Sequence, residues 1–351
     1  MKALVFNGPQ NIVYEDYPEP KLEEEGDIII AVQACSICGS DLHIYHGGQL
    51  GPHNFSQPKE SFCVGHENIG EVVEVGAGVK NYKIGDRVMV APGIGCGKCS
   101  ACLRGQLELC VQATSGPMAY GMNPKLNGGQ AQYLRVPLAD LFAQKIPEGI
   151  NDEQAVLLVD ALATGYSGVK HTQLEQGETA AVIGLGPVGL MAVESCFALG
   201  AEQVFAIDPV AARRKKAQSL GAIALCPEEA NETIMQKTSI GVDCVVEAVG
   251  HGKTINQALA LSRPGGRVSV MGMMQGNFLL PAPLIQGKGI QFYAGIASIV
   301  AHWPTLGSWL QEGKIKGEGM FSHCFSLADG AEAYAKLDAR EDDCLKVMIR
   351  P

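Results

Sequence analysis

Four cysteines of this chain are spaced closely enough to bind one metal ion. They occur as Cys96-x2-Cys99-x2-Cys102-x7-Cys110 in a glycine-bearing stretch. Four thiolates complete the tetrahedral coordination of Zn²⁺ and leave no open position for a substrate, which indicates a structural role. Iron–sulfur clusters also use sets of cysteines, but their characteristic runs have different gaps or a proline after the last cysteine. The spacing therefore predicts a structural zinc site.

A second group of possible metal ligands is dispersed along the sequence. Cys38 opens the segment Cys-Gly-Ser-Asp-Leu-His (38–43), His66 and Glu67 belong to Gly-His-Glu (65–67), and Asp160 lies far downstream. A thiolate, an imidazole and a carboxylate make a three-ligand zinc site with an exchangeable fourth position, as in catalytic zinc centres. Each residue alone also has an ordinary interpretation, as a buried cysteine, a hydrogen-bonded core histidine or a helix cap. Local spacing leaves open whether these residues meet in space.

A glycine-rich turn follows an expected strand at 179–183 and opens an expected helix at 188–199. It reads Gly184-Leu185-Gly186-Pro187-Val188-Gly189. The three glycines suit a tight turn, the close approach of backbone to a pyrophosphate, and close packing of helix on strand. The N-terminus of the helix then presents free N–H groups to the phosphates. This segment predicts a dinucleotide site.

Asp208 strengthens the dinucleotide interpretation. It ends the next expected strand, 203–207, at about the distance from the last glycine where a ribose-binding carboxylate is found. Such a carboxylate accepts a hydrogen bond from the 2′-OH of NAD and repels the 2′-phosphate of NADP. Arg213 and Arg214 follow on the next helix and would weaken that repulsion, and a helix cap before Pro209 is the ordinary alternative. We predict NAD as the cofactor.

Two kinds of domain are needed to position these residues. Residues 1–153 contain short alternating apolar runs between Gly, Pro, Asn and Asp turns, which favours a Greek-key barrel. Residues 154–295 alternate strands with helices, which indicates right-handed βαβ units and a parallel sheet. Residues 296–351 leave this pattern, and we expect them to pack on the first domain.

Composition excludes several classes of protein. The 351 residues are 46% hydrophobic and 18% charged, which is typical of a globular chain, and the formal net charge is −10. Nucleic-acid and anionic-membrane surfaces need clustered Lys and Arg, so we expect neither partner. We find no signal-peptide pattern at the start and no apolar run long enough for a transmembrane helix. Twelve cysteines without a disulfide framework fit a reducing compartment, and we expect a cytoplasmic protein.

The order of the motifs resembles the zinc-dependent medium-chain dehydrogenases, the alcohol and polyol dehydrogenase family. Cys-Gly-Ser-Asp-x-His, Gly-His-Glu, the four-cysteine segment, Ala-Thr-Gly-Tyr (163–166) and Gly-x-Gly-x-x-Gly follow one another in this chain. The resemblance covers essentially the whole sequence. It implies an α/β fold class: a chaperonin-10-like β-barrel catalytic domain (1–153, completed by 296–351) plus a Rossmann doubly wound parallel sheet (154–295).

The resemblance also implies roles for individual residues. Cys38, His66 and Asp160 match ligands of the catalytic zinc, and Glu67 resembles a residue that enters the coordination shell when substrate is absent. Ser40 and His43 match a proton relay. The positions near the nicotinamide and the rest of the cofactor are Thr164, Met271, Gly272, Met273 and Lys346.

We therefore predict an NAD-dependent zinc alcohol dehydrogenase with two Zn²⁺ per chain. The resemblance implies hydride transfer between NAD(H) and a small alcohol/carbonyl pair, with a primary, secondary or polyol alcohol as substrate. A non-catalytic NAD-binding redox sensor or scaffold of the same fold is the alternative. A zinc-free reductase of the superfamily is disfavoured by the four-cysteine segment, and a zinc-ribbon nucleic-acid binder by the net charge. Family members form dimers or tetramers, so we expect a homodimer or homotetramer that pairs through the edge strand at 290–294.

Overall fold

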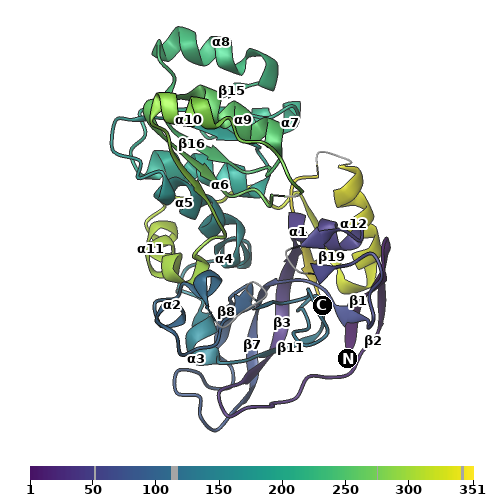
Figure 1. The fold of residues 1–351 in the computed structure, drawn as a ribbon. Helices are drawn as coiled ribbons and strands as arrows, with labels where there is room; N and C mark the ends of the chain where they lie inside the picture. Colours follow the sequence, from purple (N-terminus) through teal and green to yellow (C-terminus); the bar gives the residue numbers. More distant parts are fainter. Residues whose placement is uncertain (51–52, 112–117, 275, 341–343) are drawn as a thin grey trace. The chain divides into compact units, whose positions relative to one another are not determined.

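The chain forms two units in the computed structural model, which describes residues 1–50, 53–111, 118–274, 276–340 and 344–351. Unit 1 comprises Met1–Asp160, Ser298–Gln311 and Glu318–Pro351, and unit 2 comprises Ala161–Ala297 and Glu312–Gly317. The boundaries fall at residues 160 and 297, where the sequence led us to expect 153 and 295. Unit 1 therefore contains both ends of the chain (Figure 1).

A seven-stranded sheet is the framework of unit 1. Its strands lie in the order β12-β8-β7-β3-β20-β19, and β11 pairs with the first part of β3. The strands of unit 1 are β1 (Lys2–Gly8), β2 (Asn11–Asp16), β3 (Ile28–Ile37), β4 (Gln49–Leu50), β5 (His53–Asn54), β6 (Phe62–Cys63), β7 (Glu67–Val75), β8 (Arg87–Val90), β9 (Gly93–Ile94), β10 (Met118–Ala119), β11 (Tyr133–Val136), β12 (Ala143–Lys145), β19 (His323–Ser326) and β20 (Val347–Arg350). Its helices are α1 (Gly39–Tyr45), α2 (Ser100–Leu103), α3 (Ala139–Phe142), α4 (Asp152–Val159), α11 (Ile299–Gln311) and α12 (Gly330–Ala339), with 3₁₀ turns at Leu107–Leu109 and Leu327–Asp329.

The C-terminal segment completes this unit. Strand β20 pairs antiparallel with the end of β3, with Val347 opposite Ile37, and β19 adds to β20. Helix α11 contacts α4, where the fully buried indole of Trp303 donates a hydrogen bond to the Leu158 carbonyl at 2.9 Å. Residues from both ends of the chain, among them Leu4, Ile30 and Ile349, share one apolar core.

Unit 2 is a doubly wound parallel sheet, as predicted. Its six strands lie in the order β15-β14-β13-β16-β17-β18, and every neighbouring pair is parallel. The strands are β13 (Thr179–Ile183), β14 (Gln203–Ile207), β15 (Ile223–Leu225), β16 (Val242–Glu247), β17 (Ser262–Val270) and β18 (Gln291–Ala294). The helices are α5 (Ala161–His171), α6 (Pro187–Ala198), α7 (Ala211–Ser219), α8 (Pro227–Thr238), α9 (Gly252–Leu261) and α10 (Ala282–Lys288).

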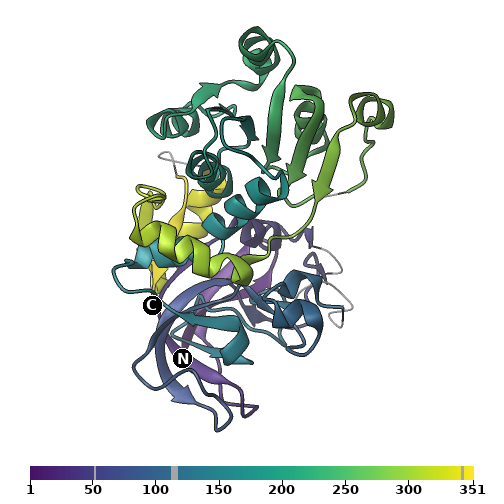
Figure 2. The same cartoon turned by 90° about the vertical axis from the view of Figure 1, so that its left-hand side faces the viewer.

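Helices cover both faces of this sheet (Figure 2). Helices α5, α6 and α7 contact one another and the strands on one face, and α8, α9 and α10 do so on the other. A strand covered on both faces is apolar along its whole length, and four of the five residues of β13 are buried. The same is true of β14. None of the described helices is long and apolar enough to cross a bilayer.

Candidate functional site

The pairing of β3 with β7 brings the first two dispersed ligand candidates together. The two strands are antiparallel, with Ser36 near the end of β3 opposite Glu67 at the start of β7. Cys38 follows β3 directly and His66 precedes β7, so both lie at the same end of the strand pair. Helix α4 packs on β3, β7 and β8, and its C-cap residue is Asp160. Residues far apart in sequence thus converge in unit 1.

Four possible ligand atoms converge within 4.8 Å of one another in this group. They belong to Cys38, His66, Glu67 and Asp160. Asp160 Oδ2 lies 3.4 Å from Cys38 Sγ and 3.4 Å from His66 Nε2. Zinc bonds of 2.0–2.3 Å in tetrahedral geometry separate ligand atoms by roughly 3.3–3.8 Å. The donor set and its spacing suit a zinc ion.

Asp41 supports two of these residues, a role that the sequence analysis did not assign. It is fully buried in α1, where its Oδ2 accepts a hydrogen bond from the Cys38 amide at 2.9 Å. Its Oδ1 lies 3.2 Å from His66 Nδ1. A carboxylate on one ring nitrogen fixes the tautomer that leaves Nε2 for a metal. The signal in the sequence is the position of Asp41 three residues after Cys38, which also caps α1.

One carboxylate oxygen of Glu67 is hydrogen-bonded to neighbouring side chains, and the other has no such bond within the described residues. Its Oε2 accepts hydrogen bonds from Ser36 Oγ and from Lys346 Nζ, the latter at 2.6 Å. Its Oε1 is buried and has no hydrogen-bond partner among the described residues. Lys346, placed near the cofactor by the family resemblance, is itself only 2% exposed and forms an ion pair with Glu67.

Burial controls the acidity of these groups. It raises the pKa of the Cys38 thiol, and it raises the pKa of Glu67 to about 7 although the Lys346 ammonium opposes this shift. Burial would lower the pKa of His66, but Asp41 and Asp160 raise that pKa well above its usual value. When ionised, the Cys38 thiolate and the carboxylates of Asp41, Glu67 and Asp160 beside the Lys346 ammonium carry three net negative charges while His66 is neutral. A divalent cation offsets most of that charge and competes with protons for the ligand atoms.

The four-cysteine segment forms a second group of possible ligands. Cys96, Cys99, Cys102 and Cys110 have all four sulfur atoms within 4.8 Å of one another. Cys99 Sγ lies 3.5 Å from Cys102 Sγ, and backbone N–H groups point at three of the sulfurs. The N–H of Cys102 is the main cause of the lowered pKa of Cys99. A set of four thiols with N–H donors fits a closed zinc site, in which the ligands are thiolates.

The glycine turn of unit 2 has the geometry of a phosphate-binding loop. Gly184 has φ of +88°, which an L-residue rarely adopts, and it lies between β13 and α6. A Cβ atom on Gly189 would lie 1.7 Å from the Gly184 carbonyl oxygen, so only glycine permits this close packing. Gly186 is the N-cap of α6, and Pro187 and Val188 begin the helix. The first N–H groups of α6 therefore face the turn.

Asp208 is bonded to this turn. Its Oδ2 accepts from the Leu185 amide at 2.7 Å and its Oδ1 from the Val210 amide at 2.8 Å. The residue is 3% exposed, and a carboxylate has further lone pairs with which to accept from a ribose hydroxyl. Arg213 Nη1 lies 3.8 Å from Asp208 Oδ2, whereas Arg214 donates to the backbone carbonyl of Asp208 at 2.8 Å.

The remaining predicted residues lie as follows. Ser40 and His43 are on α1, and Ser40 Oγ lies 3.3 Å from His66 Nε2. Thr164 is partly exposed on α5. Met271 is buried, with its side chain beside Gly168 of α5, whereas Met273 is 40% exposed.

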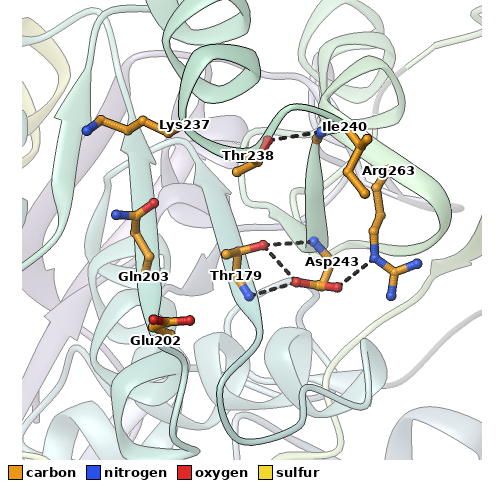
Figure 3. Close-up of a pocket in the computed structure, with 9 residues that line it drawn as sticks. Thr179, Glu202, Gln203, Lys237, Thr238, Ile240, Asp243 and Arg263 are labelled. Atoms are coloured by element: carbon orange, nitrogen blue, oxygen red, sulfur yellow. Dashed lines mark hydrogen bonds and ion pairs between the residues drawn. The ribbon is translucent and has the colours of Figure 1, made fainter.

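A separate cavity of about 420 Å³ lies beside the amino ends of β13, β14 and β16, and Figure 3 shows the residues that line it. Asp243 in this cavity accepts hydrogen bonds from the amide and the hydroxyl of Thr179, both at 2.8 Å, and from Arg263 Nε at 2.6 Å. Thr179 begins β13, whereas the glycine turn follows its last residue, so the two sites are roughly 13 Å apart along the strand. The hydrogen bonds of Asp243 join the starts of two strands, which indicates a structural role.

Two family models match this chain, one for each of the two kinds of domain. The model of the alcohol dehydrogenase GroES-like domain matches residues 24–148, and that of zinc-binding dehydrogenases matches residues 187–312. The first match confirms the predicted chaperonin-10-like domain type. The chain is 39% identical to a probable zinc-binding alcohol dehydrogenase of Mycobacterium tuberculosis over 100% of this chain and 89% of that protein. Two Bacillus subtilis proteins also match over 100% of this chain: sorbitol dehydrogenase (33% identical, 97% of that protein) and (R,R)-butanediol dehydrogenase (31%, 100%).

Solved structures resemble the whole chain. Alcohol dehydrogenase TADH from Thermus sp. ATN1 matches with a TM-score of 0.89 and 34% identity, over 100% of this chain and 99% of that one. An Escherichia coli CFT073 alcohol dehydrogenase complexed with NADH has a TM-score of 0.86 and 26% identity, with the same two coverages. A Sinorhizobium meliloti 1021 protein bound to NADP has a TM-score of 0.84 and 27% identity, again over 100% and 99%. Nicotinamide cofactors of both kinds therefore occur on this fold.

Asp243 makes the stability of unit 2 depend on pH. Burial would raise its pKa, but the Thr179 hydrogen bonds and Arg263 lower the pKa below its ordinary value. This stabilisation is therefore complete above the pKa of the unfolded chain, about 4, and is lost as the pH falls through the folded-state pKa. Asp243→Asn should destabilise the protein by about 1–3 kcal/mol at pH 7, with a difference from wild type that shrinks below about pH 4.

Urea unfolding between pH 7 and pH 3 measures this difference. Glu202→Gln is the matched control, because Glu202 is an exposed carboxylate lining the same cavity. A stability difference for Asp243→Asn that stays constant over the whole pH range would contradict the assignment.

Proposed function

Because the chain belongs to the zinc-dependent medium-chain dehydrogenase family, we propose that it is an NAD-dependent zinc alcohol dehydrogenase. It transfers hydride between NAD(H) and a small alcohol/carbonyl pair. The observation that carries the proposal is the convergence of Cys38, His66, Glu67 and Asp160 with Ser40 beside them in unit 1. An acid–base residue next to a set of metal ligands is the arrangement that alcohol oxidation needs.

Two zinc ions per chain fit the two ligand groups. Cys38, His66 and Asp160 would hold the catalytic ion, with Glu67 Oε1 as a further ligand, and the four cysteines would hold the structural one. The catalytic ion supplies Lewis acidity, which lowers the pKa of an alcohol oxygen toward neutrality. Lys346 and Ser36 hold Glu67 Oε2, which limits how far this carboxylate can move.

Ser40 and His43 supply the path for the proton. The Ser40 hydroxyl lies beside His66 Nε2. In this proposal Ser40 takes the proton of the substrate hydroxyl by hydrogen bond, and His43 passes the proton to solvent or through the cofactor ribose. His43 is three residues further along α1 and half-buried, and burial together with His46 lowers its pKa. A lowered pKa keeps the imidazole neutral and able to accept a proton at neutral pH.

The nucleotide-binding residues favour NAD over NADP. The nicotinamide ring supplies the hydride acceptor. The buried Asp208 carboxylate, which we expect to face the ribose, would repel a 2′-phosphate. The Arg214 guanidinium, a cation that could bind that phosphate, donates instead to the carbonyls of Asp208 and Pro209. Arg213, beside Asp208, is the remaining cation that would partly offset the repulsion.

The substrate we propose is a small alcohol: primary, secondary or polyol. Relatives that cover the whole chain include a sorbitol dehydrogenase and a butanediol dehydrogenase, whose names indicate a polyol and a diol.

We also propose that two copies of the chain pair through β18. This strand ends the six-stranded sheet and has β17 on one side only among the described strands. Three apolar residues near β18 in the sequence are exposed: Leu279 (90%), Leu280 (39%) and Ile296 (47%). An apolar edge strand can form hydrogen bonds with the edge strand of another chain. Pairing of β18 with β18 about a two-fold axis would join the six-stranded sheets of two copies into one continuous sheet.

Metal content tests the two zinc groups separately. We expect two zinc ions per wild-type chain and one in Cys38→Ala, which should fold normally and lose turnover. Cys99→Ala should also lose one ion. Its main effect should be a lower midpoint of thermal unfolding rather than a loss of turnover, because the structural ion stabilises its segment. Elemental analysis and thermal unfolding give both quantities. Cys324→Ala changes an exposed cysteine outside both groups and should match wild type; full turnover by Cys38→Ala would contradict a catalytic ion.

Steady-state oxidation tests the reaction and the cofactor. We expect NADH formation from one class in a panel of primary alcohols, secondary alcohols, sorbitol and (2R,3R)-butanediol, with kcat/KM at least about tenfold higher for NAD than for NADP. Ser40→Ala should lower kcat by about 10²–10⁴-fold with zinc content unchanged. A protein that holds two zinc ions and NAD but oxidises no alcohol would support the non-catalytic sensor instead.

Sedimentation tests the edge-strand pairing. Leu279→Glu places a charge in the exposed apolar segment, so we expect it to dissociate the assembly without unfolding the chain. Ile84→Glu is the matched control, because Ile84 is 68% exposed and belongs to unit 1, whereas β18 belongs to unit 2. An assembly of unchanged size in Leu279→Glu would place the interface elsewhere.

A further inference from the structure

A buried carboxylate organises the loop that follows β16. Glu247 is the last residue of β16 and is fully buried. Its side chain accepts hydrogen bonds from the amides of Val249 and Gly250, each at 3.0 Å, and from the hydroxyl of Thr254 at 2.7 Å. One side chain thus fixes both the loop and the first turn of α9.

The backbone of Glu247 also holds the loop after β17. Its carbonyl accepts from the amides of Met271 at 2.8 Å and Gly272 at 3.1 Å. The two loops touch along their backbones: a Cβ atom on Gly272 would lie 2.1 Å from the Gly250 nitrogen, and one on Gly250 would lie 2.4 Å from the Met273 oxygen. The bonds of the Glu247 side chain therefore determine where Met271–Met273 can lie.

These loops lie on one side of the point where the strand order reverses. The sheet continues from β13 to β14 in one direction and from β13 to β16 in the other, and dinucleotides bind across such a point at the carboxyl ends of the strands. Asp208, at the end of β14, marks the adenosine side. The loops after β16 and β17 are therefore on the nicotinamide side. This step rests on the proposed use of NAD.

The adenosine side has hydrogen bonds that do not involve Glu247, although Gly184 also packs against Ala248 and Val249 of the loop after β16. Asp208 accepts from the Leu185 amide, and the Gly184 amide donates to the Ile207 carbonyl at 2.8 Å, so β14 holds the glycine turn. The two halves of the cofactor site thus have different side-chain hydrogen bonds within unit 2, from Asp208 on one side and Glu247 on the other.

We propose that Glu247 is a positioning residue for the nicotinamide half of the cofactor. A carboxylate is required, because every group bonded to its two oxygens is a donor. Glutamine offers one acceptor oxygen and an NH₂ group, which would face the N–H groups of Val249 and Gly250 as a second donor. The loop would then move away from its position against Gly272.

Calorimetric titration with NADH and with ADP-ribose, which lacks the nicotinamide, tests this role in the full-length protein. In Glu247→Gln we expect NADH binding to weaken about 10- to 100-fold, while ADP-ribose binding changes by less than about threefold. Thr254→Val removes one donor to the carboxylate and should give a smaller change in the same direction. This second variant also serves if Glu247→Gln does not fold.

Asp243→Asn is the matched control. Asp243 is a carboxylate on the same strand that also accepts from backbone and hydroxyl donors (Figure 3), but it is the second residue of β16 whereas Glu247 is the last. The Asp243→Asn substitution should reduce stability and leave the ratio of the NADH affinity to the ADP-ribose affinity unchanged. If Glu247→Gln weakened the binding of NADH and of ADP-ribose equally, or weakened the binding of neither, the positioning role would be overturned. Wild-type protein that binds ADP-ribose but not NADH would refute the inference, whereas wild type that binds neither would refute the proposed NAD function itself.

Discussion

The antiparallel pairing of β3 with β7 is the constraint on which the metal-ligand group depends. With Ser36 opposite Glu67, the residue that leaves β3 and the residue that enters β7 emerge side by side. A shift of one residue would turn every side chain of a strand to the other face of the sheet. Both faces of β3 are largely buried, so the hydrogen bond between the paired residues Ser36 and Glu67, rather than the apolar pattern, favours this register. The ligand geometry is thus a consequence of ordinary sheet packing.

Charge balance is the second constraint on the same region. Four acidic groups, Cys38, Asp41, Glu67 and Asp160, lie close together in a largely buried place, which is costly unless cations neutralise them. The chain supplies the Lys346 ammonium and, when it is protonated, the His66 imidazolium, and a divalent ion in the group would offset most of the remaining charge. Lys346 therefore connects the C-terminal strand β20 to the chemistry of residues near the start of the chain.

The sequence predicted most of unit 2 because its signals are local. The bounds expected for 179–183, 203–207 and 242–247 are those of β13, β14 and β16, since strands buried on both faces are continuous apolar runs between turns. Helix α8 was not predicted: only Ala230 and Ile234 of its residues are buried, so it has little apolar periodicity. The sequence also could not predict the roles of Asp41, Ser36 and Glu247, because each acts through hydrogen bonds to residues that only the fold brings near. Family resemblance supplied the ligand set, but the partners of Lys346 required the structure.

The division of unit 1 between the two ends of the chain has a consequence for the order of events during synthesis. Unit 2 is almost entirely one continuous segment, so it can fold as soon as its residues leave the ribosome. Strand β3 is made early but pairs with β20, whose residues are translated after unit 2. Until then Glu67 has no ammonium beside it, and the ligand group carries its largest negative charge. The nascent chain therefore meets metal ions in the cell with a nucleotide-binding unit already formed and a metal centre still incomplete.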